Sequence, residues 1–328
     1  MRRLLCTCIG LLLAGSLAAC STAQYAEPIK SFSDAATQAS DAVAKMNTAL
    51  ADATLEYALR SATDPKLGSL DVQTSDSCGA FVAPAKPEDA VRCRPEFTII
   101  GEGGAKVTVT REQYTNPMGN MVAVTAAIQK YAANLAAVQA DNTADEVNTS
   151  IDKIQANLVA LVQAADKNAT LPSDLPAAAG EGVKWIFGQY IESVKFDALK
   201  KAANAAVDPL NKAKLAFSGF ETGVKGQLSL TAMRDSARAM DERRDNQVAT
   251  NRDALEKANA YDDFLTAPLS PMFDNLVAAH DKLVQALNGS GNASLKNFFT
   301  NLDQVKQQAE QIAKIATDIA AALKPKTT

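Results

Sequence analysis

Apolar residues recur at alternating steps of four and three along much of this chain, a spacing that places them on one face of an α-helix. The first such run predicts a long amphipathic helix, packed along a partner, between residues 32 and 57. Its apolar positions are Phe32, Ala36, Ala39, Val43, Met46, Leu50, Ala53 and Tyr57.

Two further runs with the same spacing predict an antiparallel pair of helices. The segment between them, residues 141–145, carries short polar side chains that suit a turn followed by a helix N-cap. The apolar positions are Met121, Val124, Ile128, Tyr131, Leu135 and Val138 in the first run, and Val147, Ile151, Ile154, Leu158, Leu161 and Ala165 in the second.

The pattern continues toward the C-terminus with more interruptions. A link rich in proline and glycine at 171–182 precedes a predicted helix over 183–194. Pro209 is then predicted to begin a new helical region, which runs from 210 to about 265. Two closing helices are predicted on either side of an Asn/Gly/Ser tract at 288–292. Their apolar seams are Phe273, Val277, His280, Val284 and Leu287, then Leu302, Val305, Ala309, Ile312, Ala316, Ile319 and Leu323.

One interval, at about residues 63–117, departs from the helical pattern because several prolines interrupt it. Within it, residues 96–111 alternate apolar and polar positions on both sides of a glycine-containing turn, which predicts a β-hairpin. A lone hairpin is marginally stable in water, so it must pack on something. We interpret its alternating apolar residues as a candidate partner surface: Phe97, Ile99, Val107 and Val109.

Composition agrees with a helical class. The chain is 47% hydrophobic, 21% charged and only 5% aromatic, and alanine is abundant, which favours close helix packing over a β-sandwich. We therefore predict a mainly α fold, an elongated antiparallel helical bundle with a small disulfide-braced β-hairpin insertion.

The first twenty residues have the order of a secretory signal. Arg2 and Arg3 precede a short apolar run over 4–13, which is too short to cross a bilayer core of about 30 Å. The segment closes with Leu17-Ala18-Ala19-Cys20 and thereby resembles a bacterial lipoprotein signal with its lipobox. The resemblance implies cleavage before Cys20, acylation of that residue as the membrane anchor, and, with serine at position 21, delivery to the outer membrane. An ordinary cleaved signal that happens to contain Cys20 is the alternative.

This interpretation divides the chain into a signal peptide at 1–19, a lipidated tether at 20–30, and a helical bundle at 31–328 that carries the insertion. Cys78 and Cys93 are then the two cysteines left to pair, and an exported protein favours a disulfide between them. A redox-active pair is the alternative, but the two residues lack Cys-x-x-Cys spacing.

Few residues suggest catalytic chemistry. The only histidine, His280, lies on a predicted apolar seam, which favours a core histidine bonded to a neighbour. No second histidine exists for a His-based zinc set, so no metal or cofactor is expected. The adjacent carboxylates at 241–242 and 262–263 point about 100° apart on a helix, which favours a solvated face over a catalytic dyad. The glycines at 101–104 serve a turn, because no helix and lysine follow as in a phosphate-binding loop.

The charge balance narrows the classes of partner that the protein can bind. The chain has 33 basic and 37 acidic residues, and loss of Arg2 and Arg3 with the signal leaves a formal charge of −6, which argues against nucleic acid. We expect a non-catalytic protein, lipid-anchored in the outer membrane through Cys20, that binds, spaces or scaffolds an envelope protein partner. A helical pore-forming protein and, less strongly, an envelope hydrolase are the alternatives.

Overall fold

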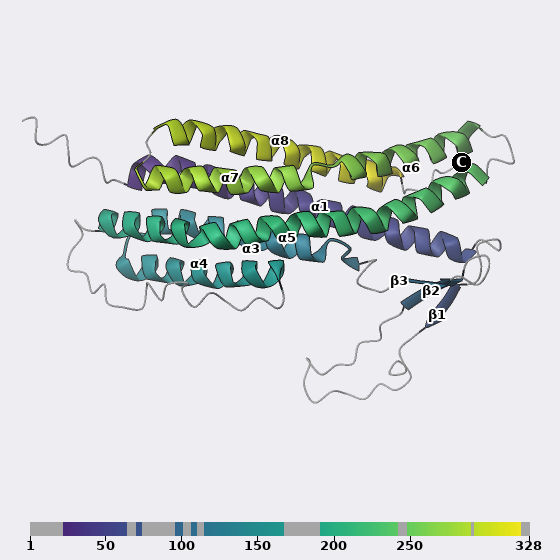
Figure 1. Cartoon of the computed structure of the whole chain (residues 1–328), viewed down its shortest axis with the longest axis horizontal. Helices are drawn as coiled ribbons and strands as arrows, with labels where there is room; N and C mark the ends of the chain where they lie inside the picture. Colours follow the sequence, from purple (N-terminus) through teal and green to yellow (C-terminus); the bar gives the residue numbers. More distant parts are fainter. Residues whose placement is uncertain are drawn as a thin grey trace, which may run out of the picture. The chain divides into compact units, whose positions relative to one another are not determined.

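The computed structural model describes residues 22–63, 70–73, 96–100, 106–109, 115–166, 191–241, 248–289 and 292–322. The fold is mainly α, as predicted. A 3-10 helix, η2 (Thr22–Tyr25), precedes the first long helix (Figure 1). The helices are α1 (Ala26–Thr63), α3 (Gly119–Ala140), α4 (Ala144–Ala165), α5 (Ile191–Asp241), α6 (Val248–Thr266), α7 (Leu269–Leu287) and α8 (Asn292–Ala322).

The helices contribute segments to two compact units. Unit 1 consists of Met1–Ser40, Ala123–Ser218 and Ser270–Gln308, and unit 2 of Asp41–Val122, Gly219–Leu269 and Ala309–Thr328. The single bundle predicted over 31–328 is therefore divided between two units, each of which is described by itself below.

Unit 1 has a core of apolar seams contributed by α1, α3, α4, α5, α7 and α8. Nearly all of the predicted seam positions in these segments are buried, and removing each large side chain from water contributes about 1.5–3 kcal/mol. Ile151 and Ala165 of α4 are only half-buried. The largest fully buried side chains of the unit are Ile29, Phe32, Ile128, Tyr131, Phe217, Phe273 and Phe298.

The predicted turn between the two helices of the antiparallel pair is confirmed, and a capping box defines it. The Thr143 hydroxyl accepts a hydrogen bond from the Glu146 backbone N–H at 3.2 Å, and the Glu146 carboxylate accepts from the Thr143 N–H at 3.1 Å. The same carboxylate accepts from the Asn142 N–H at 2.8 Å. The hydrogen bonds from Asn142 and Thr143 lower the pKa of Glu146.

The prediction that Pro209 begins a new helix is wrong. It lies inside α5, which is continuous over 51 residues. A proline within a helix removes a hydrogen bond and clashes with the preceding turn, at a cost of about 3 kcal/mol. Pro209 is itself buried, and the fully buried Ala206, Leu210 and Ala213 pack the same helix into the core on either side of it. This packing offsets the local cost. Residues 183–190 of the preceding predicted helix lie outside the described residues.

The N-terminal tether predicted at 20–30 is also wrong from Thr22 onward. Residues 22–30 are helical, and Tyr25 and Ile29 are buried. The Tyr25 hydroxyl donates a hydrogen bond to the Ala286 carbonyl at 3.1 Å, and its ring lies 5.7 Å from the ring of Phe196. These contacts, distant in sequence, recruit the segment into the core of unit 1.

Unit 2 combines helical segments with a three-stranded antiparallel sheet in the order β1 (Leu70–Gln73), β2 (Glu96–Ile100) and β3 (Lys106–Val109). The seam residues Met46, Leu50 and Ala53 of α1 are buried in this unit, as are Ile312, Ala316 and Ile319 of α8. Polar contacts join its segments: the Met118 backbone N–H donates to Asn47 Oδ1 at 2.8 Å, and Lys225 Nζ donates to the Ala267 carbonyl at 3.0 Å.

Candidate functional site

The most distinctive polar group of unit 1 is a buried cluster of three rings from three helices. Tyr131 of α3 and His280 of α7 have no exposed surface, and the Tyr131 hydroxyl lies 2.7 Å from His280 Nε2. Phe32 of α1 packs against both, with its ring 6.5 Å from that of Tyr131 and 5.7 Å from that of His280. The interpretation of His280 as a core histidine bonded to a neighbour is therefore confirmed.

Burial holds this cluster in its neutral form. Desolvation lowers the pKa of His280 from 6.5 to about 3 and raises that of Tyr131 well above its ordinary value. The hydrogen bond between Tyr131 and His280 uses only one of the two ring nitrogens of His280. If Tyr131 donates to Nε2, the proton on His280 Nδ1 has no acceptor, and Nδ1 has no partner among the described residues. The pair joins α3 to α7, and neither group is accessible to a substrate.

Asp281 and the predicted pairs of adjacent carboxylates are the acidic residues to consider for catalytic chemistry. Asp281 follows His280 along α7, and partial burial raises its pKa against the opposing effect of Lys282 and Lys214. Asp262 and Asp263 of α6 are exposed, which agrees with the predicted solvated face. The other pair, at 241–242, involves side chains outside the described part of the chain. Among the residues that the structure describes, no three of His, Cys, Asp or Glu lie together as metal ligands would.

The predicted partner surface lies on the sheet of unit 2. Phe97 pairs with Val109 and Ile99 with Val107, so the four residues occupy register positions on one face. The strand β1, which the sequence pattern did not predict, adds two apolar residues to that face, because Leu70 pairs with Ile99 and Val72 with Phe97. The only sequence signal for β1 is the short alternation Leu-Asp-Val-Gln, which is too brief to identify a strand by itself.

Three other predicted site residues, Cys20, Cys78 and Cys93, lie outside the described residues. Acylation and the disulfide therefore stay predictions. The glycine-containing segment 101–104 lies outside them as well.

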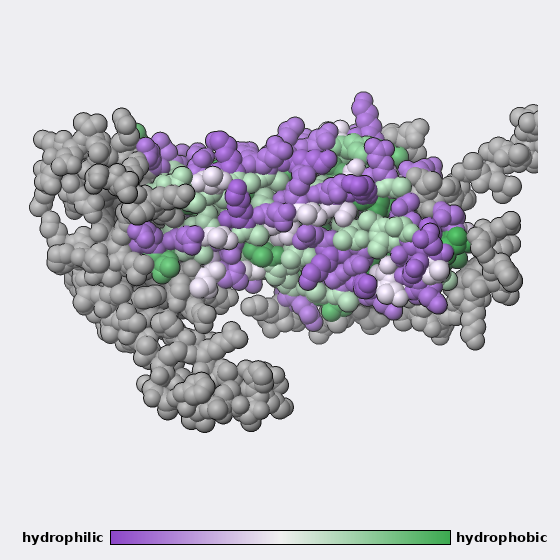
Figure 2. Space-filling model, turned by 180° about the vertical axis from the view of Figure 1, so that it is seen from behind, coloured by the Kyte–Doolittle hydropathy of each residue, from purple (hydrophilic) through white to green (hydrophobic). Residues whose placement is uncertain are grey.

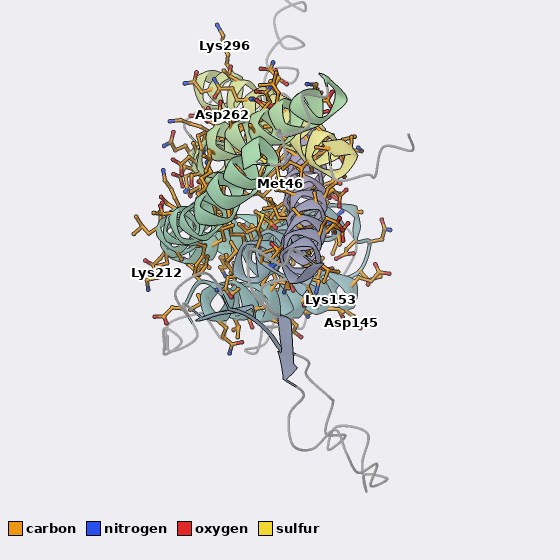
Figure 3. The ribbon with its side chains drawn as sticks, turned by 90° about the vertical axis from the view of Figure 1, so that its right-hand side faces the viewer. Met46, Asp145, Lys153, Lys212, Asp262 and Lys296 are labelled. Carbon is orange, nitrogen blue, oxygen red and sulfur yellow. The ribbon has the colours of Figure 1, made fainter. Side chains whose placement is uncertain are left out.

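The surface of the described residues offers scattered apolar positions. Leu215, Leu255 and Leu265 are the exposed large hydrophobic residues, with exposed fractions of 76%, 61% and 38%. In Figure 2 the strongly hydrophobic residues of the face shown lie apart from one another, among hydrophilic and mildly hydrophobic ones. Figure 3 shows Lys212 and Lys296 pointing away from the helices of unit 1. Single exposed leucines are ordinary and do not define a binding patch.

Within the described ranges, α3 is the one helix long and apolar enough to cross a membrane by length and composition. Half of its most apolar stretch is buried inside the structure. Its seam, which includes Val124, Ile128 and Tyr131, is part of the core, and a packed core helix passes the same test of length and composition.

No protein-family model, no curated protein and no solved structure matches this chain.

Proposed function

We propose that this chain is a lipid-anchored envelope protein that acts as a non-catalytic binding, spacer or scaffolding module. The observation that carries the proposal is a packed segment close to the lipobox cysteine: η2 spans Thr22–Tyr25, and Tyr25 is buried in the core. Packed structure is therefore present within five residues of the proposed acylation site. Acylated Cys20 would hold the protein in the outer membrane, since stable anchoring takes two acyl chains and the lipoprotein resemblance implies three.

The buried cluster supports the non-catalytic part of the proposal. His280 is the only histidine of the chain, and its Nε2 is used by Tyr131 in the core. His280 has no exposed surface, and a pKa of about 3 makes its imidazole too weak a base for the general base of an envelope hydrolase. The apolar face of the sheet, with Phe97, Ile99, Val107 and Val109, is the first candidate for the surface that binds an envelope protein.

A comparison of three forms tests anchor and binding surface separately. Cys20→Ser is expected to abolish incorporation of labelled palmitate and to release the protein from the outer membrane, with partner binding retained. Deletion of residues 96–111, joined by a short glycine linker, is expected to keep the anchor and the helical circular dichroism while losing whatever the intact protein captures from envelope extracts.

Each arm has a contrary result. Palmitate incorporation and membrane fractionation of the Cys20→Ser form would show that the anchor is elsewhere. Undiminished capture by the deletion form would move the binding surface onto the helices. Release of an entrapped dye from vesicles by the intact protein would favour the pore-forming alternative.

We also propose that Cys78 and Cys93 form a disulfide that braces the strand region. Closing a loop of about fifteen residues contributes roughly 3 kcal/mol in the chain-entropy model. Peptide mapping without reductant is expected to find the two cysteines in one cross-linked species, and reduction is expected to speed hydrogen exchange in residues 63–117 more than in the helices. Exchange that is equal with and without reductant would contradict the brace.

A further inference from the structure

Packed residues close to Cys20 limit how far unit 1 can lie from an anchor at that residue. Thr22 is two residues from Cys20, so their Cα atoms are at most about 7 Å apart. The 3-10 helix η2 then advances only about 6 Å to Tyr25. Tyr25 is buried and bonded to the Ala286 carbonyl, so no slack remains after it.

The end of unit 1 around Tyr25 is formed by several chain segments. The hydrogen bond to Ala286 places the last turn of α7 beside the start of α1. Asn288, which follows that turn, pairs with Asn204 of α5 at 3.0 Å. Figure 1 shows the α3–α4 junction, the start of α5, the end of α7 and the start of α8 at the same end as the start of α1. Asn142 marks this junction and Gln285 marks the last turn of α7, and both are exposed.

Charge at this end gives no independent attraction to a membrane. Exposed or half-exposed residues of both signs lie there, among them Glu27 and Lys30 of α1, Asp145 of α4, Lys282 of α7 and Lys296 of α8. Attraction to anionic lipid requires clustered basic residues. The position of this end is therefore decided by the length of the link to the acyl chains.

We propose that the end of unit 1 formed by the start of α1, the α3–α4 junction and the last turn of α7 faces the phospholipid headgroups. This inference rests on the proposed acylation of Cys20. The glycerol of an acylated cysteine lies at headgroup level. The short link to the folded residues keeps the Tyr25 backbone within about 13 Å of Cys20. The headgroups are the partner of this surface, and the helices of unit 1 rise from it.

Quenching by lipid measures this orientation. The acylated protein carries p-azidophenylalanine at Asn142, Gln285 or Leu215, each coupled to the same small dye, in vesicles that contain a phospholipid with a nitroxide on its headgroup. Leu215 is the matched control because it is exposed and belongs to the same unit. Leu215 also lies well away from Gln285. Its neighbour Lys214 pairs with Asp274 of α7 at 3.4 Å, and Asp274 precedes Gln285 by eleven residues, or about 16 Å along the helix axis.

Dyes at Asn142 and Gln285 are expected to lose most of their emission, whereas the dye at Leu215 keeps it. Equal quenching at all three positions would mean that the flank lies on the bilayer, and would overturn the inference. Absence of quenching at Asn142 and Gln285, in protein that carries palmitate and floats with the vesicles, would overturn it while the anchor stands. Protein without palmitate that does not float would overturn both.

Discussion

The Phe32→Ala variant is expected to lose about 3–5 kcal/mol of the free energy of unfolding. Phe32 has no exposed surface, and its ring contacts both Tyr131 and His280, which come from two other helices of unit 1. Truncation removes the transfer free energy of the ring and leaves a cavity that three packed helices cannot fully close. Urea denaturation followed by circular dichroism measures the loss.

Leu215→Ala is the matched control for that measurement. Leu215 is also a large apolar residue of unit 1, but 76% of its surface is exposed. Its truncation is expected to change the free energy of unfolding by no more than about 0.5 kcal/mol. Similar losses in the two variants would show that Phe32 is not packed in the core as described.

Stability is expected to fall as the pH is lowered from 6.5 toward 3, in part because of His280. The folded protein keeps this residue neutral down to about pH 3, whereas the unfolded chain takes up a proton near 6.5. Between these values the unfolded state binds more protons, so stability rises with pH, by at most about 1.4 kcal/mol per pH unit for one group.

The His280→Gln variant isolates this contribution. Glutamine keeps a polar group beside Tyr131 but does not titrate, so its curve of stability against pH is expected to lack the histidine slope. The difference in unfolding free energy between the two proteins should change by about 2 kcal/mol between pH 6.5 and 5. Asp281 and the other carboxylates titrate in both proteins, and their contributions cancel. Parallel curves would contradict a buried neutral His280.

Local spacing predicted most of the helical core. The seam from Phe32 to Ala53, the capped turn before α4, and the break after Leu287 all follow from residue types within a few positions of one another. Such features are predictable because helix periodicity, caps and breaks depend on neighbours along the chain. The strands β2 and β3 fall inside the predicted hairpin at 96–111, because the alternation of apolar and polar residues along a strand is also a local pattern.

The features of the fold that local patterns did not predict depend on contacts between residues far apart in the sequence. Tyr131 and His280 are 149 positions apart, and each looked like an ordinary seam residue until their helices met. Tyr25 and Ala286 are 261 apart, and their hydrogen bond docks a segment that the sequence pattern presented as a tether.

The sequence by itself determined the helical class, the apolar seams and their ends, and the lipobox-like order that leads to Cys20. Only the tertiary structure decided that Pro209 stays within α5, that β1 joins the sheet, and that Tyr25 and Ile29 are buried in the core. The reason is the same for Pro209 and for the segment around Tyr25. A local cost or a weak local preference is overruled when burial against another part of the chain supplies more free energy than the local term opposes.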